Sequence, residues 1–269
     1  MEGASRSSLK DARRALNEAL DGDVDARRLG EDLLSVSGVI GGSAVLRRAV
    51  ADPSRDGKDR AGLIDRLFAG RITDAAQEVA RAVATQRWTR DAHVSQALEA
   101  VAVEAILAHA QGKSRLSQVE DELFRFNRIV AATPDLQAAL SDRRATQSAK
   151  GNLVKTLIGD KVAPETLRLA AHAVATPTMR FDRAIQSYLD IAADRQSQVT
   201  AIVTSATELS GEQRERMASA LAKQYGQSIN INVVIDPDVL GGVRVEIADE
   251  VIEGTISNRL AAARRHVAR

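Results

Sequence analysis

Apolar residues recur every three or four positions along most of the chain before residue 197, which is the spacing of amphipathic helices. The clearest stripe consists of Leu116, Val119, Leu123, Phe126 and Val130. The same spacing predicts helices over residues 5–20, 73–86, 91–110 and 180–196. It also predicts a helix that ends at Gly41-Gly42, a short helix closed by Asp52-Pro53 and one stopped by Gly70. Thr133-Pro134 ends the 116–130 helix, and Pro164 suits the first turn of another.

The pattern changes after residue 197, where apolar and polar residues begin to alternate. Alternation predicts strands over residues 199–206, 228–236 and 243–248, and Asp249-Glu250 is expected to turn the chain into a last short strand. Between the first two strands, Ser210 and Gln213 form a capping box that opens a helix. Gly241-Gly242 is expected to supply a bulge or a positive φ, and an Ala- and Arg-rich helix is expected to end the chain.

The helical part contains an internal repeat with a shift of 90 residues. The shift matches Leu29 with Val119 and Leu33 with Leu123, and no gap is needed from residue 28 to 74. Further along, residues 81–85 match residues 172–176 one residue out of that register. We therefore predict two similar helical bundles in tandem. The alternative is two amphipathic stretches that share a phase by accident.

These patterns predict a mainly α protein with a small C-terminal α/β unit: two tandem helical bundles followed by a small sheet packed on helices. The expected domains are residues 1–113 for the N-terminal bundle, 114–197 for the second bundle and 198–269 for the α/β domain.

Composition excludes several functions. The chain has no cysteine, so disulfides and thiolate sites are excluded. A net charge of +1 with both signs mixed, and few aromatic residues, argue against a nucleic-acid binder. No apolar run approaches the ~20 residues that span a bilayer, and residues 1–6 lack the apolar core of a signal peptide. We expect a soluble, unexported protein that reaches a membrane only through partners.

No residue pattern predicts a catalytic or metal site. The four histidines, His93, His109, His172 and His266, form no metal-ligand cluster in the sequence. Gly112-Lys113-Ser114 resembles the end of a phosphate-binding loop, but Leu107 stands where that motif needs glycine. We interpret Gly112 as the stop of the preceding helix.

Two other features have alternative interpretations. The acidic run Glu120-Asp121-Glu122 lies within a helix, and we expect two of its three side chains to face water. Trp88, between Arg87 and Arg90, is either an exposed binding anchor or a core aromatic at a helix junction. No catalytic, cofactor-binding or metal-binding residue is assigned, and no cofactor or small-molecule ligand is expected.

The C-terminal residues resemble the end of the delta subunit of bacterial F-type ATP synthases, the family of the mitochondrial oligomycin-sensitivity-conferring protein. The resemblance is carried by residues 240–245, with their Gly-Gly pair before a strand, and by residues 249–260, where Glu253-Gly254-Thr255 leads into a helix with Arg259-Leu260. Upstream, the 199–206 strand followed by the capped helix agrees with it. Glu253 stands where Asp is commoner in the family.

The resemblance implies a non-catalytic stator. Family members tie the catalytic head, through the N-terminal helices of its alpha subunits, to the ends of the b subunits, and they hold the head against the torque of the rotor. The resemblance therefore implies coupling of proton transport to ATP synthesis, from a peripheral position on the cytoplasmic face of the cell membrane. The doubled helical part resembles the long actinobacterial form. Which bundle takes the alpha-subunit helix stays open, and an unrelated helical scaffold or regulatory adaptor is the alternative function.

Overall fold

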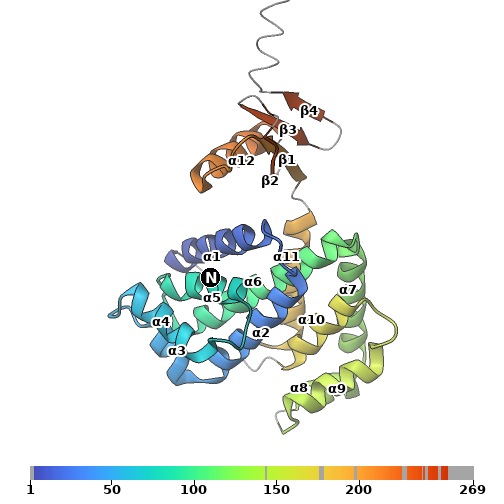
Figure 1. Ribbon diagram of the computed structural model, residues 1–269. Coiled ribbons are helices and arrows are strands. Elements are labelled where there is room, and N and C mark those ends of the chain that lie inside the picture. The colour runs from blue at the N-terminus through green and yellow to red at the C-terminus, as the bar shows by residue number, and fades with distance from the viewer. Residues whose placement is uncertain are drawn as a thin grey trace, which may run out of the picture. The chain divides into compact units, whose positions relative to one another are not determined.

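The computed structural model describes residues 3–142, 144–175, 179–196, 199–225, 229–237, 239, 242–247 and 250–253. The chain divides into two compact units, Met1–Ala193 and Asp194–Arg269. Figure 1 shows the first as packed helices and the second as a small sheet with a helix.

The helical unit contains two runs of helices. The first bundle consists of α1 (Ala4–Leu20), α2 (Ala26–Gly42), α3 (Ala44–Ala51), α4 (Gly57–Phe68), α5 (Asp74–Thr85) and α6 (Asp91–Gly112). The second bundle consists of α7 (Leu116–Ala132), α8 (Pro134–Ser141), α9 (Gln147–Ile158), α10 (Pro164–Ala175) and α11 (Phe181–Gln196).

The structure confirms the internal repeat. Each of the helices α2 to α5 begins and ends 90 residues before its counterpart among α7 to α10. Adding 90 residues to the bounds of α1 gives a range that lies within α6. Helix α6 is therefore the last helix of the first bundle and also the counterpart of α1 for the second bundle. The sequence match of residues 81–85 one residue out of register was wrong, because α5 and α10 begin 90 residues apart, at Asp74 and Pro164, and their buried residues, such as Val79 and Leu169, keep that shift. That match reflects similar Ala-rich composition.

A tertiary hydrogen bond is repeated with the helices. A carboxylate oxygen of Asp32 accepts the backbone N–H of Thr73 at 2.8 Å, at the start of α5. Ninety residues on, Glu122 accepts the N–H of Ala163 at 2.9 Å, at the start of α10. In both bundles a side chain of the long helix thus satisfies a helix N-terminus that lacks intrahelical partners.

One hydrophobic core runs through both bundles. It includes Leu29 and Leu33 of α2, Leu123 of α7 and Leu169 of α10, all fully buried. Helix α6 joins the two parts, because it carries buried residues around its whole circumference. The expected domain boundary between residues 113 and 114 stays a prediction.

The second unit is a four-stranded sheet with order β2-β1-β3-β4. Its strands are β1 (Val199–Ser205), β2 (Ile229–Ile235), β3 (Val243–Ile247) and β4 (Glu250–Glu253), and α12 (Gly211–Tyr225) precedes β2. Strand β1 pairs parallel with β2 and antiparallel with β3. Alternate residues, including Val203, Ile231 and Val245, form a small core with Leu221 of α12. The predicted fold class, mainly α with a small C-terminal α/β unit, is confirmed.

Local predictions in this unit are confirmed in part. The capping box forms, since Ser210 N–H donates to Gln213 Oε1 at 2.8 Å and Gln213 N–H donates to Ser210 Oγ at 3.3 Å. Gly242 has φ of 84°, as a positive-φ turn requires. Glu250, expected in the last turn, belongs to β4, where it pairs with Ile247. The predicted final helix lies outside the described residues.

Candidate partner-binding groove

The histidines of the described residues lie in packing and hydrogen-bonding positions. His93 Nδ1 is 2.9 Å from the hydroxyl of Ser5 and 3.1 Å from that of Thr89. Partial burial lowers the pKa of His93, which favours its neutral form. His266 lies outside the described residues. In the part of the chain that the structure describes, no group of His, Asp or Glu residues is arranged to hold a metal ion.

Two carboxylate–imidazole pairs connect α6 and α10. His109 Nε2 on α6 lies 3.4 Å from Glu165 on α10, and His172 Nε2 on α10 lies 3.4 Å from Glu99 on α6. Both carboxylates are buried. Tyr188 of α11 also donates its hydroxyl to Glu99 Oε1 at 2.5 Å. These contacts cross-link the helices.

The acidic run is not a uniformly solvated face. Asp121 is exposed, and Glu120 and Glu122 are half-buried. Glu122 accepts a hydrogen bond from the hydroxyl of Thr166 at 2.6 Å as well as from the N–H of Ala163. The expectation of two water-facing side chains was therefore too simple, because the tertiary contact with α10 gives Glu122 a capping role.

Trp88 is a core residue. Its side chain is buried and its indole Nε1 donates to the carbonyl oxygen of Val83 at 3.0 Å. Arg87 and Arg90 beside it are exposed. The interpretation as a core aromatic at a helix junction is confirmed, since α5 ends at Thr85 and α6 begins at Asp91.

The phosphate-loop resemblance lies at a helix C-terminus. Helix α6 includes Gly112, and the chain reverses at Ser114, which has φ of 55°. The N–H of Arg115 donates to Ala110 and the N–H of Ser114 donates to Gln111. This is the Schellman pattern of a helix end. The helix therefore stops at Gly112, as predicted, and the loop follows a helix instead of the strand that a phosphate loop needs.

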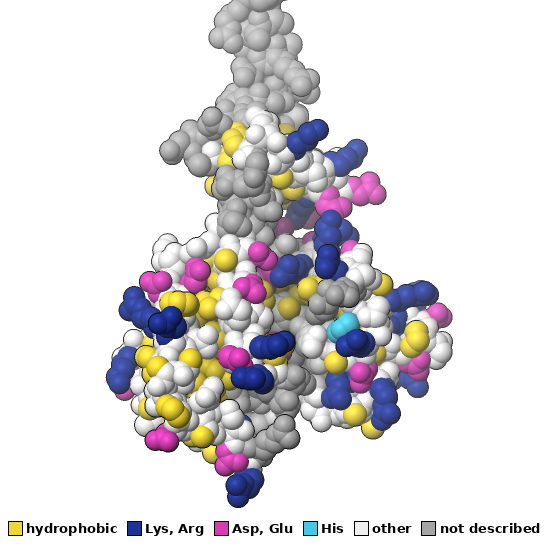
Figure 2. Space-filling view, turned by 180° about the vertical axis from the view of Figure 1, so that it is seen from behind, with side chains coloured by type: hydrophobic (Ala, Val, Ile, Leu, Met, Phe, Trp, Pro, Cys, Tyr) yellow, Lys and Arg dark blue, Asp and Glu magenta, His cyan; other side chains and the backbone are white. Residues whose placement is uncertain are grey.

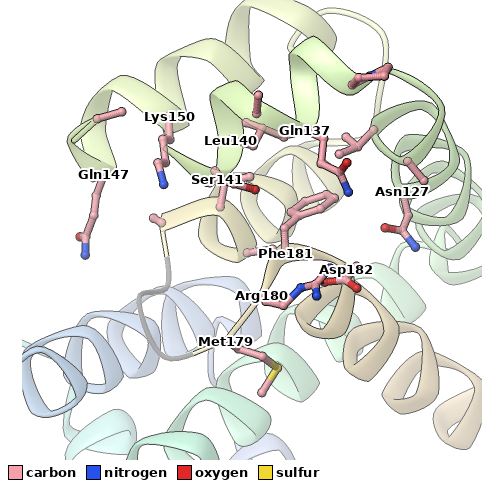
Figure 3. Close-up of a pocket in the computed structure, with 18 residues that line it drawn as sticks. Asn127, Gln137, Leu140, Ser141, Gln147, Lys150, Met179, Arg180, Phe181 and Asp182 are labelled. Atoms are coloured by element: carbon pink, nitrogen blue, oxygen red, sulfur yellow. The ribbon is translucent and has the colours of Figure 1, made fainter. Parts of the chain in front are cut away.

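An open groove of about 1020 Å³ lies in the second bundle. One side of the groove is formed by α7, α8 and the start of α9. The other side is formed by the C-terminal end of α10 and the N-terminal end of α11 (Figure 3). Val130, Leu140 and Val174 in its lining are buried, and Phe181 is half-buried. Figure 3 shows the Phe181 ring pointing into the space between the helices. The groove was not predicted from the sequence.

The polar residues of the groove lie mainly at its rim. Arg180 Nε lies 3.2 Å from Asp182 Oδ1, so those two charges pair with each other. Gln137 and Gln147 are exposed. The half-buried Lys150 has no hydrogen bond or ion pair among the residues that the structure describes.

The corresponding place in the first bundle is closed by the chain itself. Arg60, the counterpart of Lys150, is buried and donates to the carbonyl oxygens of Gln86 at 2.7 Å and Thr85 at 3.0 Å. Helix α4 can start there because its first residue is glycine. A Cβ on Gly57 would meet the carbonyl oxygen of Thr85 at 3.2 Å, and the counterpart of Gly57 is Gln147.

A salt bridge closes the first bundle at a second point. Arg47 Nε lies 3.5 Å from Asp91 Oδ2, and Arg47 also donates to the carbonyl oxygen of Gly41. The counterparts of Arg47 and Asp91 are Gln137 and Phe181. The second bundle therefore presents an aromatic ring where the first has an ion pair.

The long helices approach differently in the two bundles. Helix α2 packs extensively along α6. A Cβ on Gly30 would lie 2.6 Å from Ile106 Cγ1 and 3.0 Å from the carbonyl oxygen of Ala102. The counterpart of Gly30 is Glu120, which cannot occupy so close a crossing. Phe126 of α7 and Phe181 of α11 form an edge-to-face pair, with ring centroids 5.6 Å apart.

The surface carries no separate charged site in the view shown. Lys and Arg are interspersed with Asp and Glu over the helical unit, with hydrophobic side chains between them (Figure 2). Among the described residues no single helix is long and apolar enough to cross a membrane, although α2 and α3, bent by 104°, pass that test as a pair.

Comparison with known proteins gives consistent matches. A family model described as ATP synthase delta (OSCP) subunit matches residues 103–267. A protein named ATP synthase subunit delta from Kineococcus radiotolerans is 41% identical over 99% of this chain and 97% of its own length. Proteins of the same name from Parafrankia sp. and Streptomyces coelicolor are 43% and 40% identical, each over 100% of this chain and over 100% and 98% of their own lengths.

Proposed function

Because this chain belongs to the ATP synthase delta (OSCP) subunit family, whose members are non-catalytic subunits of the peripheral stalk of F-type ATP synthase, we propose that it ties the catalytic head to the b-subunit stalk. Association with other subunits of the complex, and a position peripheral to the membrane complex, follow from the membership.

We propose that the helical unit binds N-terminal helices of the alpha subunits in the head. The single observation that carries this is the open groove of the second bundle, whose floor is apolar. Helical bundles receive partner helices in grooves of this kind. A passive grip is what a stator needs, since it must resist torque without transforming a substrate.

We propose that the C-terminal α/β unit binds the ends of the b subunits on the cytoplasmic side of the membrane. The sheet face opposite α12 carries Ile202 and Val234, which are 41% and 45% exposed. They lie on neighbouring strands, where Ile202 pairs with Asn232 and Thr204 pairs with Val234. Apolar side chains on an open sheet face suit a partner surface.

Co-purification of the two partners with this chain tests both assignments. Deleting residues 228–269 is expected to abolish retention of a tagged b-subunit end and to leave binding of the alpha-subunit N-terminal segment. The double variant Ile202→Asp and Val234→Asp is the milder form, because it changes exposed side chains and leaves the sheet core in place. Retention of the b-subunit end by both variants contradicts the assignment. Failure of the intact chain to bind any synthase subunit contradicts the proposed function as a whole.

A further inference from the structure

A second, smaller cavity lies between the two helical bundles. Its volume is about 180 Å³, and residues of α2, α6, α9 and α10 line it. It shares only Gln147 and Ala175 with the lining of the groove. We infer that this cavity binds a small organic cation, a guanidinium or a primary ammonium group, through the carboxylate of Glu99 and the C-terminal ends of α2 and α10. The inference goes beyond the proposed function and does not depend on it.

Glu99 gives the cavity its charge. It is 6% exposed and is the one acidic residue among the described residues of the lining, from which Lys and Arg are absent. Tyr188 and His172 both contact its Oε1, whereas Oε2 has no hydrogen bond or ion pair among the residues that the structure describes. A buried carboxylate costs free energy unless its oxygens find donors. Oε2 therefore favours a cation that carries N–H groups.

Two helix C-termini make the cavity more negative. Gly42 ends α2 and Ala175 ends α10, and both residues line the cavity. The last carbonyl groups of a helix lack intrahelical donors and form the negative end of its dipole, which favours cations. Helix α9 begins at the cavity with the opposite sign, but there Thr146 already accepts the N–H of Ala149. The balance at the cavity is therefore negative.

The first bundle shows how a cation satisfies such a helix end. At the end of α5 the guanidinium of Arg60 donates to the carbonyl oxygen of Thr85 at 3.0 Å. The counterpart of Thr85 is Ala175, in the lining of the cavity. The counterpart of Arg60 is Lys150, which does not line the cavity. A cation at this end of α10 therefore comes from another molecule.

The size of the cavity limits the cation that fits. A volume of about 180 Å³ equals that of roughly six water molecules, which admits a guanidinium or ammonium group on a short alkyl chain. Nucleotides and most cofactors need pockets of about 300–1,000 Å³. The position that corresponds to Glu99 in the first repeat is Leu9, which supplies no charge. The site therefore belongs to the junction of α6 with the second bundle.

Equilibrium dialysis of the intact chain with radiolabelled propylguanidinium at pH 8, where an ordinary imidazole is neutral, tests the inference. We expect saturable binding. Propylurea has a similar shape but no charge, and it should compete at least about tenfold more weakly because it forms only neutral hydrogen bonds. Glu99→Gln keeps an acceptor for Tyr188 and is also expected to weaken binding at least about tenfold.

A matched pair of glycine substitutions tests where the cation binds. Gly38 lines the cavity and a Cβ there would meet nothing within 4 Å, so Gly38→Leu occupies the cavity without a clash. It is expected to weaken binding at least about tenfold. Gly151 on α9 has equally open surroundings outside the cavity, so Gly151→Leu should change binding by less than about twofold. Thermal unfolding followed by circular dichroism checks that each variant folds.

The same dialysis with the assembled complex separates the two sources of the cation. Equal uptake by the isolated chain and the complex identifies a free small molecule, and uptake by the isolated chain alone identifies an Arg or Lys side chain of a neighbouring subunit. Absence of saturable binding to the isolated chain, equal competition by propylurea, or equal binding by Gly38→Leu and Gly151→Leu overturns the inference. Those results leave the proposed function intact, since it fails only if the chain binds no synthase subunit.

Discussion

The two helical bundles share one plan, yet one is closed and the other is open. Helices α2 to α5 and α7 to α10 have identical lengths at a constant shift of 90 residues, and both bundles use a long-helix carboxylate to cap a later helix. They differ at a few positions where one has glycine or a paired charge and the other has a longer or unpaired side chain. The pattern that determines the helices is therefore separate from the residues that determine how closely the helices approach.

Glycine residues allow the close helix approaches of the first bundle. Gly30 lets α2 cross α6 at a distance that a Cβ cannot tolerate, and Gly57 lets α4 begin against the end of α5. The matching positions carry Glu120 and Gln147, whose side chains do not fit so close an approach. Interiors are packed densely enough that one side chain sets such a separation. A duplicated bundle can thus provide a rigid body in one copy and a docking groove in the other.

The largest effect is expected from cutting between the bundles. A chain that begins at residue 114 lacks α6, whose buried residues complete both bundles. We expect it to lose the cooperative thermal transition of the helical unit, followed by circular dichroism, because the second core is left open. A chain that begins at Asp91 keeps α6 and should retain more helix. If the chain that begins at residue 114 unfolds in a thermal transition as sharp as that of the full chain, the two bundles do not share a core.

Matched substitutions test the role of glycine at the long-helix crossing. Gly30→Ala forces a Cβ into contact with α6 and is expected to lower the free energy of unfolding by about 1–3 kcal/mol. Glu120→Ala, at the corresponding half-buried position of α7, is expected to change it by less than about 0.5 kcal/mol. Urea denaturation measures both. Equal effects would show that the crossings do not differ in tightness.

The buried Tyr188–Glu99 contact should give the second bundle a pH dependence of its own. Tyr188→Phe leaves Glu99 without the hydroxyl donor and is expected to cost about 1–3 kcal/mol at neutral pH. Burial and the neighbouring Glu99 raise the pKa of Tyr188 well above its usual value of about 10. The folded state then keeps a proton that the unfolded state loses.

The sign of this effect follows from proton counting. Stability from Tyr188 is complete below about pH 10 and falls by up to about 1.4 kcal/mol per pH unit as the pH rises above it. Urea denaturation at several pH values from neutral to alkaline should show that the free energy of unfolding falls more steeply with pH for the original chain than for Tyr188→Phe. Parallel curves would mean that Tyr188 titrates alike in both states.

The smallest effect concerns the starts of the long helices. Asp25 accepts the N–H groups of Arg27 and Arg28 and caps α2, and these bonds lower its pKa. Asp25→Ala is expected to cost about 1 kcal/mol, and the capping share should disappear as acid protonates the carboxylate. The counterpart at α7 is Arg115, which makes no side-chain cap. Asp25→Ala should lower the melting temperature more than the neighbouring Asp23→Ala does. Equal decreases in melting temperature would mean that Asp25 has no capping role.

Most of the fold could be predicted from the sequence, because it depends on short-range patterns. Apolar spacing located the helices, and the 90-residue shift was visible in residues such as Leu33 and Leu123. The capping box of Ser210 and Gln213 formed as expected. The helix stop at Gly112 was also predicted, although Ser114, a residue that seldom takes a positive φ, makes the reversal that follows it.

The groove could not be predicted from apolar spacing, since both bundles share that spacing. The signal lay in the alignment of the two copies, where Gly30 meets Glu120, Gly57 meets Gln147 and Arg60 meets Lys150. Those substitutions have meaning only when the partner helix is known. Glu122 was similarly misjudged, because its acceptor role depends on Thr166, 44 residues away.

Amide hydrogen exchange of the intact chain, with and without the alpha-subunit N-terminal peptide, tests the central difference most directly. We expect slower exchange on binding in α8, the first turns of α9 and the start of α11, with little change in the corresponding α3 and α4. Protection in α3 and α4 instead, or equal protection in both bundles, would contradict the division into a closed first bundle and an open, partner-binding second bundle.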